Sequence, residues 1–337
     1  MFRRACGWAI AVLFVAVSCS PALCWGGKGH RIVGAVADLV LEEHPKTQAK
    51  VKEILGGDTL ATVSVWADCA KGFRYCNSAP TPEEKTYANK NPHHHNFHYT
   101  DIPYQQPKYV AGTAGSGSDD VVQVMKYAIA VLRGQAPANG PAKLDQREAL
   151  WVLVHLVGDI HQPLHVASLY YDKDCGRVVD PNVVGAGQEN FGIGKTVSET
   201  TGGNDLMKGS DNLHHYWDST TVDNAMKLAG VSKTAIGPFA EYLVAHPPKK
   251  WKTTGGVDTW PEKWATEIMP VGRQAFDSIK LGEAEHPDEA HPTNLKCTAQ
   301  FTFENGYDDW AKKQALQQLG KGGFRLANLL VAIFEPQ

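Results

Sequence analysis

The chain has no apolar run long enough to cross a bilayer as a helix. Such a helix needs about 20 apolar residues, whereas the apolar run near the N-terminus extends only from Ala9 to Val17. This run follows Arg3 and Arg4 and precedes a short stretch of small residues that includes Pro21. A basic start, a short apolar middle and a small-residue exit are typical of a secretory signal peptide. We therefore predict a secreted or periplasmic protein without a membrane anchor.

The predicted signal peptide comprises residues 1–24, and cleavage after Cys24 would leave Trp25 as the first residue. A lipoprotein in which Cys19 carries the lipid is the alternative interpretation. It is the weaker one, because Ala16 occupies the position three before Cys19, where an aliphatic residue is usual. Residues 25–337 are then the folded part, which is long enough to bury a sizeable core within one domain.

The sequence also lacks an excess of basic residues. Its formal net charge is −3, and the loss of the two positive charges of Arg3 and Arg4 makes it −5. An acidic protein is a poor electrostatic match for a nucleic acid. If the substrate contains phosphate, bound metal must therefore supply the positive charge at the site.

The chain contains no Cys-x-x-Cys motif and no Asn-x-Ser/Thr sequon. The missing sequon mildly favours a bacterial periplasmic or secreted enzyme. Three of the seven cysteines lie within the predicted signal peptide. The even number that remains predicts two disulfides in an exported protein, but four cysteines allow three connectivities and the sequence does not choose among them. The remaining cysteines are Cys69, Cys76, Cys175 and Cys297.

Strand-like alternation of apolar and polar residues is scarce, and helical periodicity dominates. Between residues 31 and 54, apolar side chains such as Ile32, Val33 and Val36 recur at three- and four-residue steps. No internal repeat or change of composition marks a domain boundary, so we predict an all-α fold, a single domain of packed helices. The segments with helical periodicity are residues 31–54, 119–132, 144–158, 213–228, 260–281 and 309–334.

Residues 168–211 depart from the helical pattern. The segment is rich in Gly, Asn, Asp and Val, and it joins two segments that contain candidate site residues. Long ordered loops are often functional or contain a small hairpin. We expect a small β-hairpin in this insertion, and a solvated insertion without a role is the alternative.

Two pairs of His and Asp have the spacing of one helix face. His155 and Asp159 are four residues apart in an apolar helical segment, and His214 and Asp218 repeat this spacing in a second one. Imidazole and carboxylate together suit zinc, and zinc sites without cysteine ligands are more often catalytic than structural. Two matched pairs on facing helices can meet at one metal site. The pattern therefore predicts a catalytic metal centre.

The other histidines are interpreted by their context. His165 follows Pro163, where the chain turns after the first of these helices, and remains a candidate ligand. We interpret His161 as structural or as support for a ligand, and we expect His215 to point away from the face of its neighbour. The run 93–95 lies in a segment rich in Pro and Asn, so we expect it to be exposed, with adventitious metal binding as the alternative.

The predicted mature N-terminus adds further ligands. His30 lies five residues after Trp25. A free α-amino group has a pKa of about 7.7–8.0, so the amine of Trp25 can bind zinc when deprotonated and can chelate it together with the carbonyl oxygen. This role requires cleavage directly before Trp25. Asp68 in the sequence SVWAD and His98 in FHYTD complete the candidate ligands.

Taken together, these motifs resemble those of the zinc-dependent P-one/S-one nucleases. WGGKGH, SVWAD, FHYTD, LVHLVGDIHQPLHVA, GGND and NLHHYWD follow one another from Trp25 to Asp218. The combination is specific, although each motif alone is weak. The related zinc phospholipases C share the fold and the ligand plan. The resemblance implies an all-helical domain with a trinuclear zinc site, three Zn²⁺ ions, at the bottom of a cleft.

The resemblance also implies which residues hold the metal. All nine ligand positions of the family are filled by the expected residue types. The implied ligands are Asp68, His98 and His155 for the first zinc, Trp25 and His30 for the second, Asp159 as a catalytic bridge between these two, and His165, His214 and Asp218 for the third.

Further positions match parts of the family that act on the substrate. Lys71, three residues after the aspartate of SVWAD, would offset charge on the phosphate oxygens. Asp101, three residues after His98, would orient Lys71 or contact a base. For both Lys71 and Asp101 a surface salt bridge is the alternative. For Tyr99 the alternative is a plain core tyrosine. The positions that match the family's nucleobase region are Tyr99, Gly202, Gly203 and Asn204.

The implied activity is endonucleolytic hydrolysis of single-stranded DNA and RNA to 5′-phosphate products, together with a 3′-nucleotidase activity. Zinc supplies a nucleophile by lowering the pKa of bound water. A recessed site is reached only by a phosphate whose flanking base leaves the stack. The expected partners are thus single strands and 3′-nucleotides, and no stable protein partner is predicted. The length of residues 168–211 exceeds the family pattern and bears on cleft shape and substrate preference.

Two other functions remain as alternatives. A zinc-dependent phospholipase C would use the same chemistry on a lipid phosphodiester, but it needs an exposed apolar rim to meet a bilayer. Residues 168–211 are rich in Gly and Asp instead. A secreted zinc-binding protein without catalysis is the second alternative, and the complete set of carboxylate, imidazole and basic positions argues against it.

Overall fold

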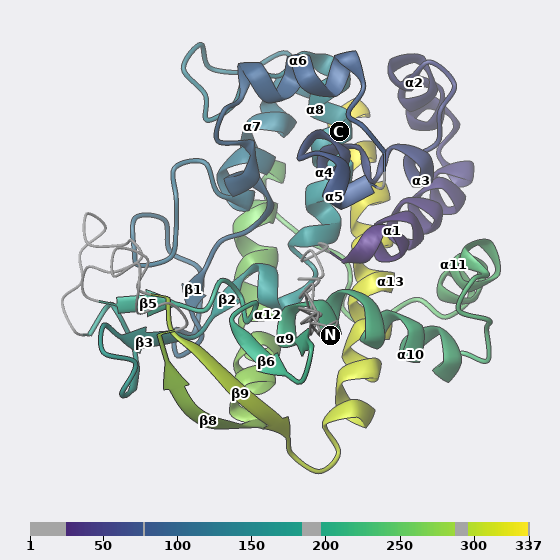
Figure 1. Ribbon diagram of the computed structural model, residues 1–337. Helices are drawn as coiled ribbons and strands as arrows, with labels where there is room; N and C mark the ends of the chain where they lie inside the picture. The colour runs from purple at the N-terminus through teal and green to yellow at the C-terminus, as the bar shows by residue number, and fades with distance from the viewer. Residues whose placement is uncertain (1–24, 77, 184–196, 287–295, 336–337) are drawn as a thin grey trace, which may run out of the picture.

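The computed structural model describes residues 25–76, 78–183, 197–286 and 296–335, so the predicted signal peptide lies outside the described residues. Helices make up most of the fold, which confirms the predicted class, and the strands gather at one end of the molecule (Figure 1).

Helix α8 (Gln146–Asp159) forms the centre of the fold. Every residue of this helix from Glu148 onward is buried, and a helix that is buried on all sides must be enclosed by other elements. Helices α1 (Gly26–Val40), α7 (Val121–Leu132) and α13 (Tyr307–Phe334) pack against it. The candidate ligands at the C-terminal end of α8 therefore lie inside the protein.

The start of α8 is fixed by a capping box. The Asp145 carboxylate accepts a hydrogen bond from the Glu148 N–H at 2.9 Å, and the Glu148 carboxylate accepts one from the Asp145 N–H at 2.9 Å. This arrangement satisfies N–H groups that have no partner within the helix. Because the box defines where the helix begins, it also sets the direction in which His155 and Asp159 point.

Helices α1 and α13 approach each other closely. A Cβ atom at Gly323 would lie 2.4 Å from Cβ of Val36, and one at Gly322 would lie 3.2 Å from a methyl group of Val33. Side chains at these two glycines would push the helices apart, because protein interiors have no room for added atoms. The contact holds α1 in place, and with it the candidate ligand His30.

The helix predicted for residues 31–54 is two helices. Helix α1 is followed by the 3-10 turn η1 (Leu41–Glu43), and α2 (Pro45–Leu55) begins with its proline. A proline fits the first turn of a helix but lacks the N–H that a helix interior requires. The other helices and turns are α3 (Leu60–Val63), α4 (Trp66–Ala70), α5 (Phe73–Cys76), α6 (Pro82–Lys90), η2 (His94–His98), η3 (Pro163–His165), α9 (Leu213–His215), the π-helical turn η5 (Tyr216–Thr220), α10 (Thr221–Leu228), α11 (Ile236–Ala245), η6 (Val257–Thr259) and α12 (Trp260–Asp277).

The strands form three small sheets. Residues 168–211 contain the predicted hairpin, in which β3 (Tyr170–Asp172) and β4 (Val178–Val179) pair antiparallel. The antiparallel pair of β8 (Ile279–Glu285) and β9 (Thr298–Phe303) was not predicted, and β8 begins within the segment 260–281 that was expected to be helical. In β9 the buried side chains of Ala299 and Phe301 alternate with exposed ones, a pattern that indicates a strand. The sheets are β1 (Ile102–Pro103) with β2 (Ala167–Ser168); β4 (Val178–Val179), β3 (Tyr170–Asp172) and β5 (Val197–Glu199); and β7 (Asp211–Asn212), β6 (Leu206–Lys208), β9 (Thr298–Phe303) and β8 (Ile279–Glu285).

Two disulfides are present, as predicted, and the structure gives their connectivity. Cys69 pairs with Cys76 across a separation of seven residues, and Cys175 pairs with Cys297 across a separation of 122. The second bond ties the turn between β3 and β4 to the start of β9. Every helix within the described residues is too short or too polar to cross a membrane.

Candidate metal centre

The first group of candidate ligands surrounds the end of α8. Nε2 of His155 lies 3.0 Å from Nδ1 of His98 and 3.6 Å from Oδ1 of Asp68. The other ring nitrogen of His155 lies 2.6 Å from the carbonyl oxygen of Ser64. A carbonyl can only accept a hydrogen bond, so Nδ1 carries the proton and Nε2 keeps its lone pair for the group. A histidine that binds metal is typically oriented by such a contact behind it.

The second group lies where α1 meets α8. Nε2 of His30 is 3.2 Å from Oδ1 of Asp159, and the His30 ring stacks on that of His155 with 3.8 Å between centroids. The ring fits because residue 158 is a glycine: a Cβ there would lie 2.5 Å from Nδ1 of His30. Trp25, one of the predicted ligands, is fully buried at the start of α1. Its carbonyl oxygen accepts a hydrogen bond from the backbone N–H of Gly29.

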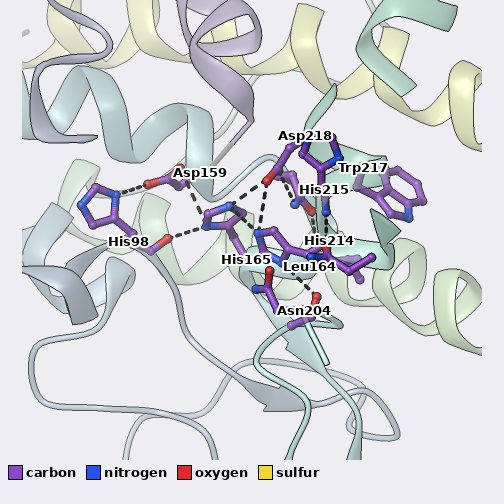
Figure 2. A network of polar contacts seen from close by, with 12 residues as sticks. His98, Asp159, Leu164, His165, Asn204, His214, His215, Trp217 and Asp218 are labelled. Carbon is purple, nitrogen blue, oxygen red and sulfur yellow. Dashed lines mark hydrogen bonds and ion pairs between the residues drawn. The ribbon is translucent and has the colours of Figure 1, made fainter. Parts of the chain in front are cut away.

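The third group joins the turn after α8 to helix α9. Nε2 of His214 lies 3.2 Å from Nε2 of His165 and 3.5 Å from Oδ2 of Asp218. Figure 2 shows His165 between the pair of His98 and Asp159 on one side and the pair of His214 and Asp218 on the other. Nδ1 of His165 also lies 3.8 Å from Oδ1 of Asp159. The three groups therefore form one continuous cluster.

The ligands of the third group are oriented by contacts behind them. Nδ1 of His165 faces the carbonyl oxygen of His98 at 2.8 Å, and Nδ1 of His214 faces that of Gly202 at 2.9 Å. Gln162 donates to the Asp218 carboxylate at 2.8 Å. Gly202 has a φ of +58°, and a Cβ there would lie 2.2 Å from a backbone oxygen, so glycine is required at this position.

The donor atoms of the cluster fit metal ions. His30, Asp159 and Asp218 hold buried nitrogen or oxygen atoms that have no hydrogen-bond partner among the described residues. Burying such atoms without a partner is costly, and coordination of a cation would satisfy them. Burial also raises the pKa of Asp218 well above its ordinary value, and a cation beside this carboxylate would favour the ionised form.

For His30, His214 and Asp159, electrostatics favour the protonation state that binds metal. Burial, with His155 adding to the effect, lowers the pKa of His30 to about 4. Burial, together with His165, lowers the pKa of His214 to about 3. For Asp159, burial favours the neutral acid, but His155 and His165 outweigh it and hold the pKa well below its ordinary value. Neutral imidazoles and an ionised carboxylate are the forms in which these groups bind a cation.

Lys71 lies beside the first ligand group. Its Nζ donates to Oδ1 of Asp68 at 2.9 Å, and only 6% of its side chain is exposed. The same Nζ lies 5.1 Å from the centre of the Tyr75 ring. Burial alone would raise the pKa of Asp68, but Lys71 and the neighbouring imidazoles keep it below its ordinary value. Lys71 therefore brings a fixed positive charge to the edge of the cluster.

A cavity of about 220 Å³ opens beside the cluster. Its wall includes three candidate ligands, His98, His165 and His214, together with Lys71. The remaining predicted residues that line it are Tyr99, Asp101 and Asn204. The cavity is bounded by candidate ligands, a cation and an aromatic ring, and it has room for part of a nucleotide rather than for a duplex.

Asn204 and Tyr99 present polar and aromatic groups to this cavity. Asn204 donates through Nδ2 to the carbonyl oxygen of Thr201 at 2.7 Å, and its Oδ1 has no hydrogen-bond partner among the described residues. The hydroxyl of Tyr99 donates to Asn96 at 3.4 Å, which restrains the half-buried ring. Gly203, the other predicted substrate residue, is instead buried against the side chain of Leu213.

Asp101 has a partner that the sequence did not reveal. Burial and the carboxyl group of Glu199, to which Asp101 is hydrogen-bonded, raise the pKa of Asp101 well above its ordinary value, and burial raises that of Glu199 as well. Two carboxyl groups in contact cannot both ionise readily, so the pair retains a proton. Glu199 lies on β5, within the segment 168–211 for which a functional role was predicted. The pair also borders a neighbouring cavity of about 510 Å³.

The remaining histidines have different roles from the ligands. The run 93–95 was predicted to be exposed, which is wrong for His94: it is only 4% exposed, because the turn η2 packs it against Tyr87. His95 lines the cavity together with Tyr75, and the sequence assigned neither residue to the substrate site. His161 contacts Arg325 of α13 at 3.0 Å and the backbone of α8 at 2.7 Å, so it connects two helices.

The chain is similar to known nucleases. The family model described as S1/P1 Nuclease matches residues 25–335. Endonuclease 2 of Arabidopsis thaliana is 27% identical over 92% of this chain and 90% of its own length, and Endonuclease 4 of the same plant is 24% identical over 98% and 96%. Nuclease S1 of Aspergillus oryzae is 27% identical over 69% of this chain and 68% of its own length.

The fold and the site first define a mostly helical protein with buried His and Asp groups that fit metal ions. Because the family model covers nearly the whole described chain, the chain belongs to the S1/P1 nuclease family, a family of zinc-dependent enzymes. The protein is therefore a nuclease, and its substrate is a nucleic acid.

Proposed function

We propose that the protein is an endonuclease for single-stranded DNA and RNA that leaves 5′-phosphate products and also removes the phosphate of 3′-nucleotides. The observation that carries this proposal is the cavity beside the ligand cluster, which is lined by His98, His165, His214 and Lys71 together with the ring of Tyr99. A phosphate and one unstacked base can occupy such a site together, whereas a base that remains paired in a duplex cannot reach it.

Three zinc ions complete the proposed site, one for each ligand group. Asp159 belongs to two groups, since its Oδ1 faces His30 at 3.2 Å and its Oδ2 faces His98 at 3.1 Å. The second group has fewer side chains of its own, and we assign to it the amino nitrogen and carbonyl oxygen of Trp25. That assignment depends on cleavage directly before Trp25 during export, so the enzyme would act outside the cytoplasm, secreted or in a periplasm.

Zinc bound at these groups would supply a nucleophilic water of lowered pKa and would neutralise charge on the leaving oxygen. The protein supplies the geometry and the remaining charge. Lys71, held by Asp68, directs its ammonium group to the phosphate oxygens, where negative charge grows during attack. The rings of His155, His165 and His214 are oriented by backbone carbonyls that contact their second nitrogens.

The base beside the phosphate is bound by Tyr99 and Asn204. Stacking on an aromatic ring tolerates any base, and it contributes roughly 1–3 kcal/mol per base. Asn204 lies at the wall of this cavity, and its Oδ1 has no hydrogen-bond partner among the described residues, so we assign to this side chain a contact with the base edge. Asp101, which shares a proton with Glu199, adds a polar group to the same cavity wall, and the pair together lines the neighbouring cavity.

Strand selectivity tests the proposal. One labelled oligonucleotide is assayed alone and annealed to its complement, beside a 3′-nucleotide and phosphatidylcholine as separate substrates. Unpairing and unstacking a base costs a few kcal/mol, so we expect the single strand to be cut on the order of 10²-fold faster than the duplex, with 5′-phosphate ends. Equal rates on both forms would contradict the recessed site, and preferential hydrolysis of the lipid would identify a phospholipase instead.

A further inference from the structure

A short segment closed by a disulfide borders the cavity and carries two side chains that the proposed mechanism does not use. We call residues 69–76 the rim segment. Lys71 and Tyr75 of this segment line the cavity, while Phe73 and Arg74 between them are exposed. Fully extended backbone spans at most about 3.6 Å per residue, so the Cα of Phe73 lies within about 7 Å of the Cα atoms of both cavity-lining residues.

Phe73 is notable both for its exposure and for its position between two cavity-lining residues. It is 64% exposed, and no other phenylalanine of the described residues is classed as exposed. A single exposed apolar side chain is common on protein surfaces. Phe73, however, lies two residues from Lys71 and two from Tyr75, both of which line the cavity, and the wall of this cavity already contains Tyr99. Single-strand binding proteins use exposed rings near a cationic groove to stack bases.

The charge next to the ring is available for a phosphate. Arg74 is exposed, and within the part of the chain that the structure describes it forms no ion pair. The chain as a whole is acidic, so an unpaired arginine beside the site is a local exception to the overall charge. A phosphate group of a strand that leaves the cavity would meet this guanidinium close to the Phe73 ring.

The rim segment is rigid before any substrate arrives. The Cys69–Cys76 disulfide joins its ends, with 5.0 Å between the Cα atoms. Inside it, the Lys71 N–H donates to the Asp68 carbonyl at 3.0 Å, and the Tyr75 N–H donates to the Gly72 carbonyl at 3.0 Å. A binding surface that is already ordered loses less conformational entropy on association. The backbone that carries Phe73 is thus held at both ends of the segment.

We propose that the rim segment is a second subsite for single-stranded nucleic acid, in which Phe73 stacks on a base flanking the nucleotide held in the cavity and Arg74 contacts a phosphate. This inference rests on the proposed single-strand activity. It extends that activity by predicting that strands are used better than minimal substrates, because they reach the rim as well as the cavity.

The test uses oligonucleotides of about ten nucleotides with one cleavable phosphodiester, a length within the range that such binding sites cover. An abasic nucleotide is placed at each position flanking the cleavable bond in turn. For the wild type, we expect loss of one flanking base to lower kcat/KM by at least about fivefold, the scale of one stacked base. Phe73→Ala should show the same loss on the intact strand and no further loss when that base is missing.

Matched variants separate stacking from folding. Phe73→Tyr keeps an aromatic ring and should retain the wild-type rate, and all variants should keep their thermal unfolding temperature and zinc content. Arg74→Ala should reduce the slope of log kcat/KM against log salt by about 0.7, the value for one phosphate contact on a single strand. Arg133→Ala, an exposed arginine at the end of α7, should leave the slope unchanged.

The outcomes distinguish this proposal from the one on which it rests. If the wild type does not prefer single strands, the proposed function fails before any variant is compared. If the wild type prefers them but Phe73→Ala cuts every strand at the wild-type rate, the rim subsite alone is overturned. Equal losses for Phe73→Ala on intact and abasic strands would also overturn it, since they would show that the ring does not act through a base.

Discussion

The floor and the rim of the same cleft are built in opposite ways. The floor consists of eight buried His and Asp side chains that come from helices and the turns beside them, and most of the rings are fixed by a second contact, as His155 is by Ser64. The rim segment, residues 69–76, instead exposes Phe73 and Arg74 and is fixed by a disulfide. We therefore expect the floor to determine which bond is broken and the rim to determine which substrates reach it.

The largest effect is expected at the floor, from Asp159→Asn. The carboxylate contacts His30 at 3.2 Å and His98 at 3.1 Å, so the substitution removes charge from two ligand groups at once. Changing a residue that only orients a ligand costs roughly 10–100-fold, and we expect a larger loss of kcat/KM here, together with a loss of bound zinc.

Asp309→Asn is the matched control for this variant, because Asp309 is exposed and pairs only with Lys312 on the surface of α13. It should retain both activity and zinc. Wild-type zinc content and activity in Asp159→Asn would show that Asp159 is not shared between metal sites.

A smaller effect is expected between floor and rim, from Lys71→Ala. Loss of one preorganised electrostatic donor costs on the order of 10²-fold or more in kcat. Because Lys71 contacts the ligand Asp68 without being a ligand, zinc content should not change. Steady-state kinetics and metal analysis check both expectations, with the half-exposed Lys50, which pairs with Glu53, changed to alanine as the control. An unchanged kcat would mean that Lys71 serves only to hold Asp68.

The smallest effect is the one expected for Phe73→Ala at the rim. The three variants form a series from the floor to the rim. Along this series we expect the loss of kcat/KM to become smaller and to depend more strongly on the length of the substrate. The account would be contradicted if a floor variant lost much more kcat/KM on long substrates than on short ones, or if the rim variant lost the same on both.

The sequence predicted the floor better than the rim for a physical reason. His155 with Asp159 and His214 with Asp218 are four residues apart, and a helix places such pairs on one face whatever surrounds it. The contact between Asp101 and Glu199 joins residues far apart in the chain, so only the folded structure reveals it. The same holds for the bond between Cys175 and Cys297.

The features that the sequence did not predict also depend on contacts between distant parts of the chain or on breaks in a helix. The helix predicted over residues 31–54 is interrupted at Pro45, where helical periodicity continues although the helix does not. His94 is buried because η2 packs against Tyr87 of α6, which is a tertiary effect. Tyr75 and His95 reach the cavity because a disulfide and a 3-10 turn place them there. The spacing of residues along the sequence does not indicate that Tyr75 or His95 lines the cavity.

The central claim is that the floor holds three metal ions, and counting them tests it most directly. Zinc is measured per chain in active enzyme whose N-terminus has been shown to be Trp25, and anomalous scattering then locates each ion. The account predicts three zinc ions per chain, one beside each of the groups that contain His98, His30 and His214. One zinc ion or none in fully active enzyme would contradict it.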